Sequence, residues 1–430
     1  MYNYIIKYIW NHFQFQKLSE DELLEKQLEM LNSIFCFSKK YVPFYHNLYK
    51  EYGLMEMTIR SPGDVQKIPI VSKNDFRKVP PKDLIATVPI KGINQHYTSG
   101  STGEPFLVMT TKEVEYTAHI RIFFTLAKYG YRPYYPMLIL SRYEPNTTFR
   151  IEKDMGPYKF VHRYLKFFRR EIVSIYDKKG NIVRKLKQIK PYVFVSTPGI
   201  LSILIAYLKE INCKFNIPII FLTSETITSQ FLQDIHIYLG RTVIDMYGCM
   251  ESPSIGYEIN GSGKREIFTE TCFLELIKER NMNDNYNNVI ISNLLNFVQP
   301  IIRYQVNDLA INNNKRTMGL RSIGKVIGRI DDIIKTSNGA VIAHHHAYEM
   351  FMDFNECKQF KFIQKGDQII LQLVIDKNRD KNKIIEKAKI ILKNRYPDVE
   401  FNIQIVDAIL PDPITGKIKN IEVQNNDPNR

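Results

Sequence analysis

The alternation of short apolar runs with helix-length segments between Gly92 and Pro300 constrains the fold of this chain most strongly. Apolar runs of strand length are Met137–Leu140, Val193–Val195, Ile217–Leu222 and Val243–Met246, and helical segments between them include Ile200–Glu210 and Ser229–Leu239. Neighbouring parallel strands need a crossover connection, which is usually a helix. The pattern therefore predicts an α/β domain with a mostly parallel sheet.

Beyond Gly328 the pattern changes to that of a compact α+β domain of about a hundred residues. The predicted elements are a hairpin (Arg329–Ile342), a helix (His346–Asp353), two strands (Gln359–Gln364 and Gln368–Ile375), a helix (Ile384–Arg395) and a last strand (Phe401–Val406). Because no low-complexity linker separates the two patterns, the boundary must be a short hinge. We expect a large N-terminal domain at 1–328, a hinge at 329–332 and a small domain at 333–430.

Two amphipathic helices are predicted at the N-terminal end. In Tyr2–Phe15, Ile5, Ile9 and Phe13 recur at helical spacing with Trp10 alongside. This helix either packs against the protein body, which we favour, or rests on a membrane surface. A second helix begins at the acidic segment Ser19–Glu22 and continues through Leu24, Leu28, Leu31 and Ile34.

Charge and hydropathy narrow the set of partners. A net charge of +14 in 430 residues favours anions, but the basic segments Lys166–Arg170 and Lys178–Lys190 accompany no nucleic-acid-binding motif, so we expect no nucleic acid partner. No apolar stretch approaches the roughly 20 residues that cross a bilayer, and no signal peptide is evident. We therefore expect a cytoplasmic protein without stable membrane insertion.

The cysteines and histidines do not form a metal-binding pattern. The five cysteines are scattered without a CxxC pair, so reduced thiols are expected. Consecutive histidines such as His344–His346 cannot all face one ion, and the stretch Ser252–Cys272 holds one cysteine and no histidine, so no zinc site is expected.

The segment Tyr97–Pro105 carries the strongest local signal for chemistry. It interleaves the hydroxyl residues Thr98, Ser99, Ser101 and Thr102 with Gly100 and Gly103. Glycines let backbone N–H groups approach a phosphate chain and hydroxyls donate to it, although such a loop taken alone is also compatible with a simple turn. No Gly-Lys-Ser/Thr ends it, so it is not a Walker A loop.

Five motifs in order resemble those of the adenylate-forming acyl-CoA ligases. They are the phosphate loop at 98–105, Asp245–Glu251 (Tyr-Gly-x-Thr/Ser-Glu), Pro300–Leu309 (Arg-Tyr-Arg-x-x-Asp-Leu), the hinge motif Gly328–Lys335, and Leu410–Pro411 with Thr415–Ile418 (C-terminal lysine motif). Val42–Tyr45 and Ile68–Lys73 resemble the phenylacetate-CoA ligase branch and its capsule-cluster relatives. The likeness covers nearly the whole chain.

The resemblance implies a role for each matching residue. Thr98, Ser99, Gly100, Ser101, Thr102 and Gly103 would hold the ATP phosphates. Tyr247 would stack on adenine, Gly248 would lie beside it in the ATP site, and Asp308 would accept hydrogen bonds from the ribose hydroxyls. Glu251 would ligate Mg²⁺, and Arg329 would reach the nucleotide. Asp331 would be the hinge about which a mobile small domain turns, and the ammonium of Lys417 would hold the acid and the α-phosphate together during adenylation.

Three positions depart from the family pattern. Met250 stands where Thr or Ser precedes the magnesium glutamate, Glu104 where the phosphate loop often has Lys, and Gln305 where an arginine is customary. These changes are compatible with an unusual acyl substrate, with a slower enzyme, or with a degenerate member that no longer adenylates an acid. The resemblance itself implies ATP, Mg²⁺ and coenzyme A as cofactors.

The leading interpretation is an AMP-forming carboxylic acid ligase that passes its acyl group to coenzyme A. The second is an adenylating ligase with an amine, sugar or carrier-protein acceptor in surface-polysaccharide biosynthesis, and the third is a catalytically degenerate nucleotide-binding scaffold. The acid is expected near Arg142, Ser196–Gly199 and Ser224–Glu225 by analogy with the family. Dimers are common among such relatives, so a homodimer is compatible with the resemblance.

Overall fold

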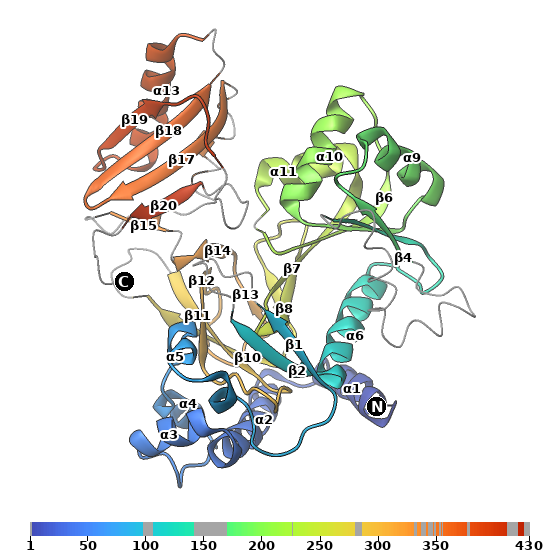
Figure 1. The fold of residues 1–430 in the computed structure, drawn as a ribbon, viewed down its shortest axis with the longest axis vertical. Helices are drawn as coiled ribbons and strands as arrows, with labels where there is room; N and C mark the ends of the chain where they lie inside the picture. The colour runs from blue at the N-terminus through green and yellow to red at the C-terminus, as the bar shows by residue number, and fades with distance from the viewer. Residues whose placement is uncertain are drawn as a thin grey trace. The chain divides into compact units, whose positions relative to one another are not determined.

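The computed structural model describes residues 2–97, 106–141, 170–225, 227–279, 286–330, 333–336, 341–342, 347, 350–351, 354, 356–375, 379–410 and 420–424. The chain forms two compact units (Figure 1). The first unit comprises residues 1–17 and 112–268, and the second comprises residues 18–111 and 269–430. The predicted division at 329–332 is a different boundary, and it stays a prediction.

A large mixed sheet forms the centre of the first unit. Its strands are β3 (Met137–Ser141), β4 (Arg170–Ser174), β5 (Val193–Ser196), β6 (Ile217–Thr223), β7 (Gly240–Cys249), β8 (Ser252–Ile259) and β9 (Arg265–Ile267). Within this unit they run in the order β9-β8-β7-β6-β5-β3-β4. The pairs from β4 to β7 are parallel, as the sequence predicts, whereas β8 and β9 add antiparallel strands.

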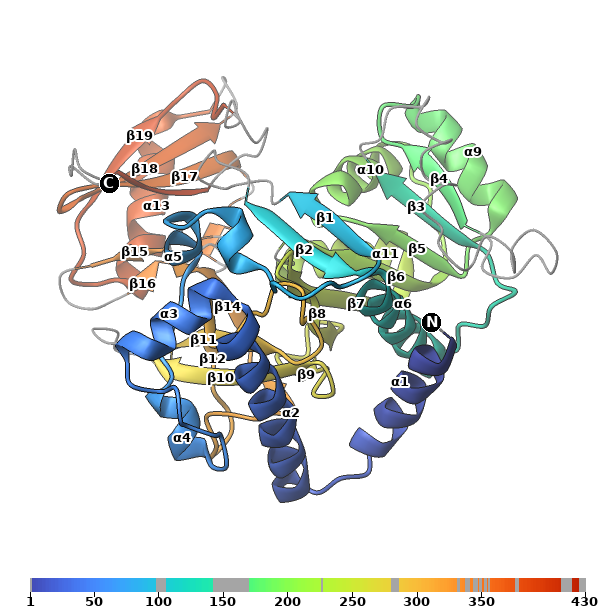
Figure 2. The same ribbon diagram turned by 60° about the horizontal axis from the view of Figure 1, so that its bottom comes forward.

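Helices cover both faces of this sheet (Figure 2). They are α6 (Lys112–Lys128), α9 (Lys179–Ile189), α10 (Pro198–Glu210) and α11 (Ser229–Tyr238), and α1 (Tyr2–Phe15) packs on α6. Alternate strand residues face opposite sides, so Leu138 and Leu140 pack with α9, α10 and α11, while Met137 packs on the other side with Leu126 of α6. The result is a three-layer α/β arrangement, which confirms the predicted fold class.

The second unit begins with helices α2 (Glu20–Tyr41), α3 (Pro43–Glu51), α4 (Pro62–Lys67) and α5 (Lys73–Arg77) and the 3₁₀ turn η1 (Pro81–Leu84). The hairpin β1 (Ile93–Tyr97) and β2 (Leu107–Thr111) follows them. An antiparallel sheet then runs in the order β10 (Cys272–Lys278), β11 (Tyr286–Asn293), β12 (Tyr304–Ile311) and β14 (Val326–Arg329), and the short β13 (Ser322–Ile323) precedes β14.

The C-terminal part of the second unit has a core of its own, which includes Phe351, Phe362, Leu371, Ala388 and Leu392. The elements are β15 (Ile334–Lys335), β16 (Val341–Ile342), β17 (Cys357–Lys365), β18 (Gln368–Ile375), α13 (Lys381–Arg395), β19 (Phe401–Ile405) and β20 (Ile421–Gln424). The sheet order β19-β18-β17-β20 shows that the strand at Phe401 is not the last one. The prediction was wrong there because β20 pairs in parallel with β17, far away in sequence.

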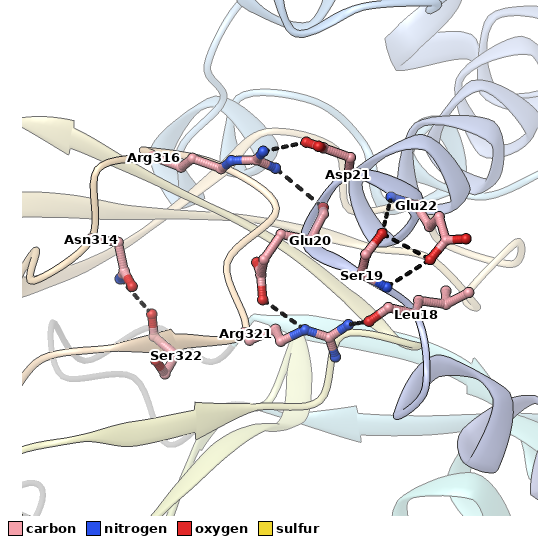
Figure 3. Close-up of polar contacts among 9 residues, drawn as sticks. All are labelled: Leu18, Ser19, Glu20, Asp21, Glu22, Asn314, Arg316, Arg321 and Ser322. Carbon is pink, nitrogen blue, oxygen red and sulfur yellow. Dashed lines mark hydrogen bonds and ion pairs between the residues drawn. The ribbon is translucent and has the colours of Figure 1, made fainter.

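The start of α2 is fixed by caps and by ion pairs (Figure 3). Ser19 and Glu22 form a reciprocal capping box, as the acidic start of the helix predicts. The Arg321 guanidinium pairs with Glu20 at 2.8 Å and donates to the Leu18 carbonyl, while Arg316 pairs with Asp21. The first carboxylates after α1 are therefore neutralised within the second unit.

Two further findings concern the chain as a whole. All five cysteines are among the described residues, and each is a free thiol. Over the part of the chain that the structure describes, no helix combines the length and the apolar character that crossing a bilayer requires.

Candidate active site

Three predicted site segments follow adjacent strands of the first unit. Ser196–Gly199 follows β5, Ser224–Glu225 follows β6, and Tyr247–Glu251 ends β7, and these strands are parallel neighbours. Because the carboxyl ends of parallel strands meet at one edge of a sheet, the three segments share that edge. Ligands of open α/β sheets bind there.

The segments after β5 and β6 are joined directly. The Gly199 N–H, at the start of α10, donates to Glu225 Oε2 at 2.7 Å. A Cβ at Gly199 would lie 2.8 Å from the same oxygen, so a larger residue would displace the carboxylate. Ser224 has a φ of 76°, a left-handed conformation that turns the chain at this point. Arg142, which was also predicted for this region, lies outside the described residues.

Gly248 is required by its close approach to the neighbouring strand. β7 and β8 form an antiparallel pair with an irregularity between Tyr247 and Cys249. A Cβ on Gly248 would lie 2.4 Å from the Pro253 carbonyl oxygen, a backbone atom that cannot move aside alone. The glycine of the Tyr-Gly motif is therefore required by backbone packing.

The half-buried Tyr247 ring rests on a cation. The guanidinium carbon of Arg265 lies 5.2 Å from the ring centroid, within the range of a cation–π contact. Arg265 is 6% exposed and pairs with Asp245 at 2.7 Å and with Glu258 at 3.2 Å. Although burial alone would lower the pKa of Arg265, the Asp245 and Glu258 carboxylates raise it above its ordinary value. This charged cluster holds one face of the Tyr247 ring.

Glu251 lies in the turn between β7 and β8. It is 6% exposed, whereas the preceding Met250 is 39% exposed. Carboxylate oxygen is the ligand type that Mg²⁺ prefers, while a thioether is a weak acceptor. The residue that departs from the family pattern thus projects outward and does not fill the core.

In the second unit, two residues from separate motifs face each other. Asp308 on β12 is directly opposite Arg329 on β14, and the Asp308 carboxylate lies 3.9 Å from Arg329 Nε. The two side chains are 18% and 43% exposed. Asn307 precedes Asp308 within β12 and has a φ of 62°, a left-handed conformation that asparagine tolerates, at the irregularity in the pairing of β12 with β11. The predicted ribose residue and the predicted nucleotide-contacting arginine are therefore brought together.

The N-terminal motifs support the segment that leads to Asp308. The buried Tyr45 hydroxyl donates to the Pro300 carbonyl at 3.1 Å and accepts from the Ile302 N–H at 3.1 Å. Burial raises the pKa of Tyr45 well above its usual range. Val71 joins the same segment through backbone bonds with Arg303 and Gln305 at 3.0 and 2.9 Å.

Arg303 is a structural residue. Its guanidinium forms two bonds to the buried Glu275, at 3.0 and 2.9 Å, and donates to the carbonyls of Gln66 and Ile68. Burial raises the pKa of Glu275, and Arg303 acts in the opposite direction. The half-buried Gln305, which stands where the family has an arginine, donates to Asn288 Oδ1 at 3.4 Å.

The remaining predicted residues lie outside the described ones, and their roles stay predictions. They are Thr98, Ser99, Gly100, Ser101, Thr102, Gly103, Glu104, Asp331, His344–His346 and Lys417.

The motifs did not reveal the buried charged residues that support the predicted site residues. Arg265, Glu258 and Glu275 belong to none of the quoted motifs, although Asp245 lies inside one. The available signal was the presence of single charges within apolar strand-like runs, since a charge is almost never fully buried unless it is paired. The partner of such a charge is not evident from the sequence.

Comparisons with known proteins identify relatives of this chain. It is 23% identical to Protein CapK of Staphylococcus aureus over 428 residues, which is 94% of this chain and 90% of that protein. It is 23% identical to the phenylacetate-coenzyme A ligase of Escherichia coli over 332 residues, with 74% and 73% covered. No protein-family model matches the chain.

Solved structures show the same fold. A 2-hydroxyisobutyryl-CoA ligase in the postadenylation state superposes with a TM-score of 0.70 at 16% identity, over 94% of this chain and 90% of that one. The o-succinylbenzoate coenzyme A synthetase of Bacillus subtilis, with ATP and magnesium, gives 0.54 at 14% identity over 76% and 68%. This chain is therefore similar to Protein CapK and to the phenylacetate-coenzyme A ligases, and it has the fold of the adenylate-forming acyl-CoA ligases whose structures are solved.

Proposed function

We propose that this protein is an AMP-forming ligase that activates a carboxylic acid with ATP and then transfers the acyl group to coenzyme A. The observation that carries the proposal is the pairing of Asp308 with Arg329 on adjacent strands. These residues come from two separate motifs, and a nucleotide-binding role predicts that they lie together.

In the proposed reaction, a carboxylate oxygen of the acid attacks the α-phosphorus of ATP. The bond between the α-phosphorus and the bridging oxygen breaks, and pyrophosphate leaves with the bond electrons. Lys417 would hold the acid and the α-phosphate in position, which lowers the entropic cost of bringing the two reactants together. Its positive charge would also stabilise the negative charge that develops around the α-phosphorus in the transition state. The thiol of coenzyme A then displaces AMP from the acyl carbon.

The residues present fit a magnesium ion. Glu251 supplies a carboxylate at the carboxyl edge of the sheet, beside the segments proposed for the acid. A bound Mg²⁺ would neutralise phosphate charge there. Tyr247, held on one face by Arg265, would stack its other face on adenine, and Asp308 would accept from the ribose hydroxyls.

The names of the relatives support coenzyme A as the proposed acyl acceptor. Phenylacetate-coenzyme A ligase and 2-hydroxyisobutyryl-CoA ligase are named for coenzyme A as acceptor. The similarity to CapK covers 94% of this chain, against 74% for the phenylacetate enzyme. For this reason the second candidate function is an adenylating ligase in surface-polysaccharide biosynthesis, with an amine, a sugar or a carrier protein as acceptor.

Pyrophosphate release from ATP and Mg²⁺ tests the proposal, with a panel of aryl, fatty and amino acids. We expect release with one class of acid and a loss of at least about a hundredfold in Lys417→Ala, since a preorganised charge of this kind contributes on that scale. Lys365→Ala, an exposed lysine at the end of β17, is the matched control and should be unaffected. ATP binding without release for any acid would instead favour the degenerate scaffold.

A further inference from the structure

One face of α1 is apolar and exposed. Ile6, Trp10 and Phe13 are 65%, 62% and 52% exposed, and their spacing of four and three residues places them on one side of the helix. Large apolar side chains that gather on an exposed face mark an interaction surface more often than scattered ones do. These three residues are called the α1 apolar face below.

The opposite face of α1 anchors the helix to the first unit. Tyr8 and Phe15 are 5% and 4% exposed, and the Tyr8 hydroxyl accepts from Arg121 of α6 at 3.5 Å. The His12 ring stacks on Phe124 of α6 with a centroid distance of 4.8 Å. Packing on the protein body, which the sequence favours, therefore accounts for this face and for one edge of the Phe13 ring, whose centroid lies 5.3 Å from that of Phe124, while Ile6 and Trp10 stay exposed.

The charges of α1 and of the residues that directly follow it are compatible with an anionic partner. Lys7 and Lys17 are exposed, and the segment from Tyr2 to Lys17 contains no Asp or Glu. The first carboxylates that follow, Glu20 and Asp21, are paired with Arg321 and Arg316 (Figure 3). The whole chain carries a net charge of +14.

We propose that the α1 apolar face docks the protein reversibly on an anionic lipid bilayer, with Trp10 at the interface and Lys7 and Lys17 near the headgroups. Tryptophan favours the boundary between acyl chains and headgroups, and lysine attraction to anionic lipid adds to apolar burial. One such helix gives peripheral attachment and not insertion.

Trp10 is the single tryptophan of the chain, so its fluorescence reports on α1 without any substitution. We expect a shift of emission to shorter wavelength when the full chain meets vesicles of phosphatidylglycerol and phosphatidylcholine. The shift should be absent with phosphatidylcholine alone and should diminish as salt is raised, because exposed charges are then screened.

Two substitutions and a control locate the surface. Ile6→Gln retains the reporter and should weaken vesicle affinity about tenfold, since it removes the burial of a large apolar side chain. Lys7→Glu should weaken it by a similar factor at low salt. Tyr176→Ser, at a 67% exposed residue elsewhere in the first unit, should leave binding unchanged.

Three results would overturn the proposal. The first is an unshifted Trp10 spectrum at saturating anionic lipid, and the second is vesicle binding that survives Ile6→Gln and Lys7→Glu together. The third is a shift without vesicles that grows with protein concentration, alongside a sedimenting dimer that Ile6→Gln dissociates, which would assign the face to a second copy of the chain.

Discussion

Asp308 shows how a single carboxylate gains a partner from the next strand. Its side chain is 18% exposed and faces Arg329 at 3.9 Å, so it is held without being sealed from solvent. If the Asp308 carboxylate accepts hydrogen bonds from the ribose hydroxyls, the substitution Asp308→Ala should raise the KM for ATP about 10- to 100-fold. A hydrogen bond to a charged group contributes about 1.5–3 kcal/mol.

Steady-state kinetics at saturating acid measure that effect. Asp367→Asn, an exposed carboxylate in the turn between β17 and β18, serves as control and should leave the KM for ATP unchanged. An unaltered KM in Asp308→Ala would remove Asp308 from the nucleotide site.

Arg265 is one of the residues that the motifs did not reveal. Arg265→Met would leave Asp245 and Glu258 without their shared cation, so we expect a loss of about 3–5 kcal/mol in the free energy of unfolding. The triple variant that adds Asp245→Asn and Glu258→Gln should recover most of this loss. Chemical denaturation of both variants tests the prediction, and equal instability of the two would contradict it.

At the scale of elements, the N-terminal motif around Tyr45 supports the segment that carries the site. Tyr45→Phe removes a hydroxyl that bonds to both Pro300 and Ile302 in a buried setting, so unfolding should become about 1–3 kcal/mol easier. Tyr52→Phe, at a 56% exposed position, should change stability by less than about 0.5 kcal/mol. Urea denaturation distinguishes them, and equal effects would show that the Tyr45 bonds contribute nothing.

The elements that the sequence predicted well are those with strong local periodicity. β3, β5, β6 and β7 match apolar runs, and α10 and α11 match helical segments, because each buries a face that its own pattern defines. The antiparallel sheet of β10, β11, β12 and β14 was not predicted, because its register depends on partners from separate parts of the chain. β20 was missed for the same reason.

For the candidate site, too, the residues in local motifs could be predicted and those that depend on pairing between strands could not. Tyr247, Glu251, Asp308 and Arg329 were recognised because their motifs are contiguous in sequence. The support from Arg265 under Tyr247, and from Glu275 under Arg303, depends on pairings between strands. Such pairs arise from the register of the sheet, which a linear pattern does not encode.

At the scale of the whole molecule, the predicted hinge at 329–332 should separate the two half-reactions. Asp331→Pro would restrict the backbone rotation about which the small domain is expected to turn. We expect pyrophosphate release to stay within about threefold of the unsubstituted protein, while acyl transfer falls at least about a hundredfold. Single-turnover assays of each step measure this separation, and equal losses in both steps would argue against a hinge.

The proposed function depends on attack by the acid at the α-phosphorus of ATP. The most direct measurement starts from the acid that supports pyrophosphate release, labelled with ¹⁸O at both carboxylate oxygens. After complete turnover, AMP and pyrophosphate are analysed by mass spectrometry. Adenylation followed by acyl transfer predicts one ¹⁸O in AMP and none in pyrophosphate. Label in inorganic phosphate with ADP as the product, or unlabelled AMP, would contradict an acyl-adenylate and with it the proposed function.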